Sequence, residues 1–171
     1  MPEIPAAGWF SLPTLGLVLI TCICGWFMMQ LEILGVRILV PYFGSSVTVV
    51  TGSVIGVFLL SLSIGYLLGG WLCGRIETWF WLGLVMLLVG IWKYIIPSIK
   101  EPVCDPISMS EISIEWGSLM ASFILYGIPT ILLGTVSPVV VHRLTTQTGN
   151  SGFSTGLILA TSTLAGFSGC L

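Results

Sequence analysis

Two charged residues, Glu32 and Arg37, are the strongest candidates for chemistry because each lies beside or between long apolar runs. A charge in such a run is costly, and it predicts a functional ligand or ion site. The two residues are five apart, about 140° around a helix, so they do not form a clean pair on one helix. Arg37 is expected near a helix end, where snorkelling explains its charge. Glu32 lies about 7.5 Å deeper and is either a hydrogen-bonded anchor or a group that binds a cation or relays a proton.

The other side chains that commonly carry chemistry are few. There is one histidine (His142), one aspartate (Asp105) and one asparagine (Asn150). Such an inventory supports no soluble-type catalytic triad, no histidine-rich metal site and no haem held by two histidines. We therefore predict no enzyme activity, no metal and no cofactor, although a bound lipid or pigment stays open. His142 and Arg143 end an apolar run, which favours contact with lipid headgroups.

Five cysteines are an odd number, so at least one is unpaired within the chain. Cys22 and Cys24 are two apart, which turns their side chains about 200° from each other on a helix. They can neither bridge nor chelate jointly. Cys73 and Cys170 also lie in apolar context, whereas Cys104 is expected in a polar loop. We interpret the cysteines as small packing residues.

The composition limits the class of protein. Hydrophobic residues make up 56% of the chain, against about 45–50% in soluble proteins, and charged residues 7%, against about 25%. These values exclude a soluble globular domain and a disordered tail. Five Lys and Arg residues are too few for a nucleic-acid-binding face. The chain is therefore predicted to be a multi-pass protein of the lipid bilayer.

Charge-free runs locate the membrane spans, since about 20 apolar residues cross the hydrocarbon core as a helix. Four runs are long enough: 4–31, 38–74, 116–142 and 144–171. The shorter run 78–92 ends at Lys93, which can snorkel and extend that span to about residue 96. We predict one all-α transmembrane domain over 1–171. Its five helices are expected at about 13–36, 48–72, 79–97, 116–141 and 153–171, a bundle that is half-transporter-like.

Several residues predict details of these spans. Trp79 to Trp81 at one end of the third span, with Trp92 and Tyr94 at the other, are expected to form aromatic belts that set its depth. Pro129 lies near the middle of the fourth span. It should kink that helix and free a carbonyl that a neighbouring helix must satisfy.

The stretch 98–115 is expected to be an acidic polar loop, since Pro102 and Pro106 would prevent a long helix. Residues 108–111 have the spacing of a capping box and predict a short interfacial turn there. The N-terminal residues 1–5 contain no Lys or Arg, so no cleavable signal peptide is predicted. The few basic residues in the loops favour a cytoplasmic N-terminus in a bacterial inner membrane or an equivalent one.

Glycines repeat at four-residue spacing in two of the predicted spans. Residues four apart share a helix face, so glycines there let another backbone approach closely. The predicted packing glycines are Gly52, Gly56, Gly65, Gly69, Gly156 and Gly166. They favour tight packing within the chain, against other membrane subunits or in a homo-oligomer; smooth, sliding transporter helices are the alternative.

Five segments carry a resemblance to a known family. They are 32–46 (EILGVRILVPYFGSS), 55–60 (IGVFLL), 65–70 (GYLLGG), 133–138 (LGTVSP) and 162–166 (STLAG). They resemble the membrane domain of fused transporter-like/spermidine synthase proteins, in which a multi-pass domain precedes a soluble aminopropyltransferase. The resemblance covers about 30–75 well and 130–170 loosely. It implies a signature at Glu32, Arg37 and Pro41.

The chain departs from that family in two respects. It has no soluble stretch for the aminopropyltransferase domain, so aminopropyl transfer is not expected. Gly74 precedes Arg75 where the family often has an acid that latches the loop. Two functions therefore compete. The first is a non-catalytic subunit of a larger membrane assembly. The second is a transporter-like module that binds or passes a small cation such as a polyamine.

Overall fold

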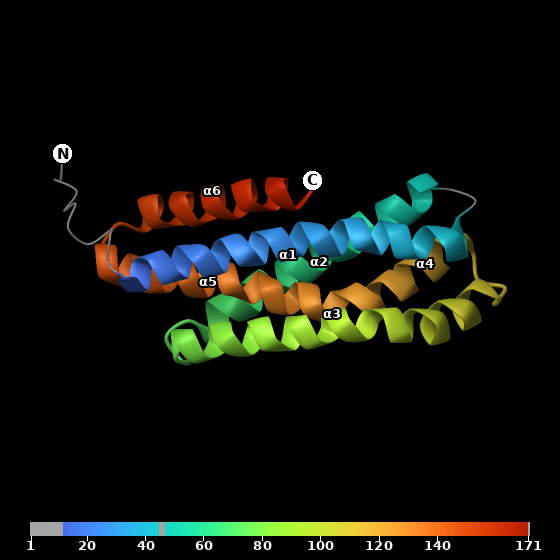
Figure 1. The fold of residues 1–171 in the computed structure, drawn as a ribbon, viewed down its shortest axis with the longest axis horizontal. Helices are drawn as coiled ribbons and strands as arrows, with labels where there is room; N and C mark the ends of the chain where they lie inside the picture. Colours follow the sequence, from blue (N-terminus) through green and yellow to red (C-terminus); the bar gives the residue numbers. More distant parts are fainter. Residues whose placement is uncertain (1–11, 45–46, 171) are drawn as a thin grey trace.

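A computed structural model describes residues 12–44 and 47–170 and shows long helices lying side by side along one axis (Figure 1). The described residues form five helical rods. Four of them are single helices, and the remaining rod joins α4, a π-helical segment η2, and α5 end to end. The elements are α1 (Leu12–Phe43), α2 (Val47–Leu72), α3 (Thr78–Ser108), α4 (Ile114–Ser122), η2 (Phe123–Gly127), α5 (Ile128–Thr148) and α6 (Ser151–Gly169). The predicted all-helical fold is confirmed.

Four rods are long and apolar enough to cross a membrane: α1, α2, α3 and the α4–η2–α5 rod. The fifth rod, α6, was predicted as a span over about 153–171, but it contains many Ser, Thr and Gly residues and is not among the four helices that are apolar enough. It runs beside the first half of α1, and at Gly169 it reaches the level of Gln30. There the Gln30 side chain donates a hydrogen bond of 2.7 Å to the Gly169 carbonyl. Gln30 therefore satisfies a carbonyl at the end of α6.

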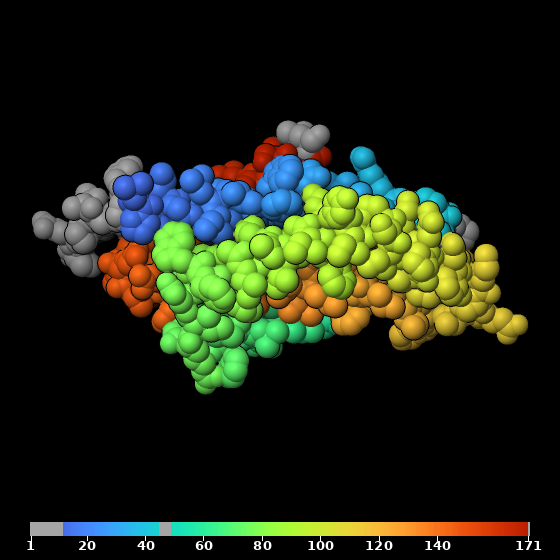
Figure 2. All heavy atoms as spheres, turned by 60° about the horizontal axis from the view of Figure 1, so that its bottom comes forward, coloured from blue at the N-terminus to red at the C-terminus, as the bar shows by residue number. Residues whose placement is uncertain are grey.

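Successive rods run in opposite directions (Figure 1). The two most extensive helix contacts are those of α1 with α6 and of α2 with α5, and both pairs run parallel. In the second pair Gly65 meets Gly134, and Gly69 meets Pro138. α3 lies across one face, between α1 and the α5 rod (Figure 2). Each of the four long rods contributes buried side chains to the centre. They are Leu31 of α1, Val54 of α2, Val89 of α3, and Tyr126, Leu133 and Val136 of the α4–η2–α5 rod.

Three helices extend well past their predicted ends, and one of them is α5, which continues to Thr148 where the predicted span ends at 141. α1 continues through Pro41 to Phe43, and α3 continues to Ser108 through Pro97, Pro102 and Pro106. The prediction of a loop over 98–115 was wrong, because only 109–113 lie outside helices. Each proline removes one backbone donor, and all three prolines of α3 occupy exposed positions. The inward side of α3 stays packed past the prolines, since Cys104 lies in the core and Val103 and Ile107 pack against it.

The longer α3 corrects three further expectations. Cys104 is not in a polar loop; it is fully buried within the helix. Ser108 does not begin a capping box, because its hydroxyl donates back to the Asp105 carbonyl at the C-terminal end of α3. Trp92 lies in the middle of α3 and not in an aromatic belt at its end. The residues 1–11 and 171, including the region of the signal-peptide prediction, lie outside the described residues.

Pro129 is the second residue of α5, just after η2, the segment in which the backbone widens from an α-helix to a π-helix. Proline at this position has no N–H for the Leu125 carbonyl, four residues earlier. The indole N–H of Trp92 on α3 donates to this carbonyl at 2.9 Å. The prediction that a neighbouring helix satisfies the freed carbonyl is thus confirmed, and the irregular backbone is buried in protein as a bilayer requires.

Candidate functional site

Glu32 and Arg37 lie on α1, Glu32 half-buried and Arg37 exposed. Within the described part of the chain, neither side chain takes part in an ion pair or a hydrogen bond. They do not meet each other, as their spacing predicts. The structure therefore brings no second charged group to Glu32 from residues 12–44 and 47–170.

Lys93 is a third charge inside the bundle, and the sequence predicts only that it snorkels at the end of the third span. Lys93 lies near the middle of α3, and its ammonium faces two aromatic rings of α1. The Nζ atom is 4.9 Å from the ring centroid of Phe27 and 5.5 Å from that of Trp26. Such cation–π contacts stabilise a cation where water is scarce. Lys93 thus serves the α1–α3 contact.

Three of the predicted packing glycines lie at close helix contacts. A Cβ atom at Gly65 would lie 2.5 Å from the Ile131 carbonyl oxygen, and one at Gly69 would lie 2.7 Å from that of Thr135. On α6, Gly166 faces Met29, whose Cγ would lie 3.0 Å from an added Cβ. A side chain at Gly65 or Gly69 does not fit without moving a backbone, whereas one at Gly166 requires the Met29 side chain to shift.

The other three predicted packing glycines face open space. Cβ atoms added at Gly52, Gly56 or Gly156 would meet no atom of the described residues within 4 Å. Gly56 also borders a surface groove of about 320 Å³ between α2 and the α4–η2 segment. Its other walls are apolar: Val57, Leu60, Trp116, Leu119, Met120, Phe123 and Ile124.

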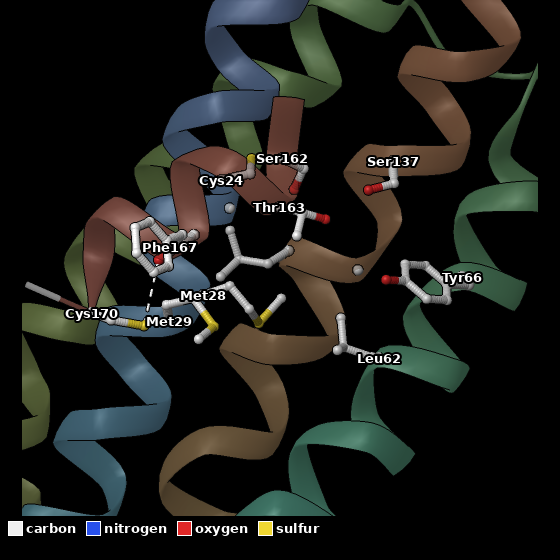
Figure 3. Close-up of a pocket in the computed structure, with 14 residues that line it drawn as sticks. Cys24, Met28, Met29, Leu62, Tyr66, Ser137, Ser162, Thr163, Phe167 and Cys170 are labelled. Carbon is white, nitrogen blue, oxygen red and sulfur yellow. Dashed lines mark hydrogen bonds between the residues drawn. The ribbon is translucent and has the colours of Figure 1, made fainter. Parts of the chain in front are cut away.

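A cavity of about 380 Å³ lies where α1, α2, α5 and α6 meet (Figure 3). It is level with residues 24–29 of α1 and 133–137 of α5, near the middle of both rods. None of its lining residues is charged. They are Cys24, Gly25, Met28, Met29, Leu62, Tyr66, Leu133, Gly134, Ser137, Ser162, Thr163, Gly166, Phe167 and Cys170. Sequence reasoning missed this cavity, because its hydroxyl groups come from three helices that are far apart in the chain: Tyr66 from α2, Ser137 from α5, and Ser162 and Thr163 from α6.

The hydroxyl groups of this cavity point into it from opposite walls. Tyr66 and Ser137 face it from α2 and α5, and Ser162 and Thr163 face it from α6 (Figure 3). Thr163 donates to the Leu159 carbonyl at 2.8 Å. The other three hydroxyls have no hydrogen-bond partner in the part of the chain that the structure describes.

His142 and Arg143 line a separate, more polar pocket at the end of the bundle where α2 leads into α3. Glu77 and Thr78 line it too, and the turn includes Gly74 at a φ of 76°. That left-handed conformation suits glycine. Both basic side chains are exposed, so their expected contact with lipid headgroups stays a prediction.

The five cysteines are all free. Among the described residues, no group of three or more His, Cys, Asp or Glu side chains is arranged to hold a metal ion. Taken with the four spanning rods, the fold defines a multi-pass helical membrane protein. In comparisons with known proteins, no family model, no curated protein and no solved structure matches this chain.

Proposed function

We propose that this chain is a non-catalytic, multi-pass subunit that packs into a larger membrane protein assembly. The observation that carries the proposal is the division of the glycines on α2. Gly65 and Gly69 lie in close contact with the backbone of α5, whereas Gly52 and Gly56 lie on a helix face with no described atom within 4 Å of an added Cβ. Small residues on a membrane helix allow a second backbone to approach closely, which lipid tails do not need.

The groove beside Gly56 supports a protein neighbour at the same place. Trp116, Met120 and Phe123 form its far wall, so a helix lying on Gly52 and Gly56 would also cover these apolar side chains. Van der Waals packing of this kind drives helix association in membranes, where the hydrophobic effect between helices is weak.

A mild-detergent extraction from native membranes tests this proposal by the mass and composition of the particle that contains the chain. We expect a particle with fixed protein partners. A leucine at Gly56 should release the chain, because its side chain would occupy the space of the partner backbone. Gly83→Leu is the matched control, since Gly83 lies on α3 with open space around it.

Two results would contradict the proposal. One is a wild-type chain that is extracted alone, as a monomer. The other is a Gly56→Leu variant that stays folded and keeps every partner, since the open face would then not be an interface.

A second function follows from the family resemblance: a transporter-like module that binds or passes a small cation such as a polyamine. The observation that favours it is the half-buried Glu32, which has no ion-pair partner in the described part of the chain. The central cavity does not add to this support, because no acidic residue lines it. We therefore place this function second.

A further inference from the structure

We propose that the cavity between α1, α2, α5 and α6 binds an uncharged, hydroxyl-bearing membrane amphiphile, with its polar head inside the bundle. The cavity volume of about 380 Å³ falls within the usual range of roughly 300–1,000 Å³ for small-molecule sites. Its place near the middle of the rods puts it at the level of the hydrocarbon core, so a ligand would enter from lipid.

The polar atoms in the cavity call for a partner. In a bilayer, a hydroxyl or carbonyl without a hydrogen bond is costly, because no water is present to satisfy it. Tyr66, Ser137 and Ser162 present three such hydroxyls. The Gly134 carbonyl is a fourth group, since Pro138, four residues later, has no N–H to donate. No side chain of residues 12–44 and 49–170 donates to that carbonyl.

These groups select the chemistry of the ligand. A ligand hydroxyl can donate to the Gly134 carbonyl and accept from the Tyr66 or Ser137 hydroxyl, so both of its capacities are used. A charged head would be buried without a counter-ion, because none of the lining residues is charged. The apolar body of the ligand would lie on Met28, Met29 and Phe167.

The opening of the cavity agrees with entry from the lipid phase. Tyr66 is 46% exposed and Phe167 is 68% exposed, so both extend to the outer surface of the bundle. Met28 and Met29 form an adaptable floor, since thioether side chains fill irregular space. The cavity therefore opens to the lipid beside the rings of Tyr66 and Phe167, while the Tyr66 hydroxyl points into it (Figure 3).

Photolabelling of the full chain in phosphatidylcholine vesicles tests the proposal, with a long-chain alcohol that carries a diazirine as the probe. We expect cross-links to cavity residues, and we expect unlabelled hexadecanol to compete. In the double variant Tyr66→Phe, Ser137→Ala, competition should need about tenfold more hexadecanol, because the ligand hydroxyl loses both of its possible hydrogen-bond donors while the shape of the cavity is kept.

The matched control is Tyr94→Phe, Ser63→Ala, which removes the same groups from exposed positions outside the cavity. It should label as the wild-type chain does, and helical content measured for both variants shows that they fold. Three results would overturn the proposal. The first is that the variant and the control need the same hexadecanol concentration for competition, and the second is that hexadecanoic acid at pH 9 competes as well as hexadecanol. The third is labelling that hexadecanol does not reduce and that is spread evenly over all lipid-facing helices. The last result would mean ordinary lipid contact only.

Discussion

At the residue scale, the contact between Trp92 and the Leu125 carbonyl decides how the chain tolerates Pro129. A single indole N–H reaches across from α3 and occupies the acceptor that proline leaves without its usual donor. Side-chain hydrogen bonds between membrane helices are worth about 0.6 kcal/mol on average and up to about 1.7 kcal/mol. We expect this one at the upper end of that range, because its acceptor belongs to an irregular backbone segment.

Trp92→Phe should therefore destabilise the bundle by about 1.5 kcal/mol, since the Leu125 carbonyl loses its donor while most of the ring packing remains. The measurement is reversible unfolding in mixed micelles of increasing SDS fraction. Trp116→Phe serves as control, because the Trp116 side chain is 65% exposed and donates no hydrogen bond to a backbone carbonyl of the described residues. Equal loss of stability in both variants would assign the effect to ring size and not to the hydrogen bond.

Glu32 separates the two proposed functions. The subunit proposal expects that the purified chain shows no saturable binding of spermidine by isothermal titration calorimetry. The transporter-like function expects binding that Glu32→Gln abolishes while the helical content is unchanged, because the half-buried carboxylate is its only acidic group in the middle of α1. Binding of that second kind would make the transporter-like function the better one.

At the element scale, the parallel contact of α2 with α5 depends on the absence of side chains. Gly65→Leu should destabilise the bundle by about 3 kcal/mol, because its Cβ alone would lie 2.5 Å from a backbone oxygen of α5. Gly83→Leu on α3 should change stability little, since that glycine faces open space. The same SDS titration measures both. A Gly65 variant as stable as the Gly83 variant would show that α2 and α5 do not pack this closely.

The elements also show what a sequence can and cannot predict. Charge-free runs predicted five rods, four of which are long and apolar enough to cross a membrane, because the cost of burying a charge in a bilayer is large and local. Helix ends were predicted less well. Pro102 and Pro106 were predicted to stop the helix, whereas α3 continues through both, with Ile99, Val103 and Ile107 packed against the core. That outcome depends on which face of α3 is packed, which one sequence does not state.

The candidate site was harder to predict for a related reason. A charge inside an apolar run is visible in the sequence, so Glu32 is predicted as a candidate site from the sequence alone. The cavity instead gathers Tyr66, Ser137 and Ser162 from three helices that are far apart in the chain. A single Ser or Tyr in an apolar run does not indicate a site by itself. Only the packing of α6 beside α1 and of α5 beside α2 brings them to one space (Figure 3).

At the scale of the whole molecule, the alternating directions of the rods assign each connection to one of two ends. The turn at 73–77 and the connection at 149–150 share one end, and 109–113 lies at the other (Figure 1). If the long rods cross the bilayer, these two ends lie on opposite sides of it. The predicted cytoplasmic N-terminus places the 73–77 end inside the cell.

Cysteines placed at Glu77, Gln147 and Met109 in a Cys73→Ala parent test this arrangement with a membrane-impermeant maleimide. We expect the cysteine at 109 to react in intact cells, and those at 77 and 147 to react only in inverted vesicles, because all three positions are exposed and lie at opposite ends of the rods. The parent without an added cysteine gives the background from the remaining natural thiols. Reaction of 77 and 109 from the same side would contradict a bundle in which α3 spans the membrane. Reaction of all three with the sides exchanged would keep the bundle and reverse only its predicted orientation.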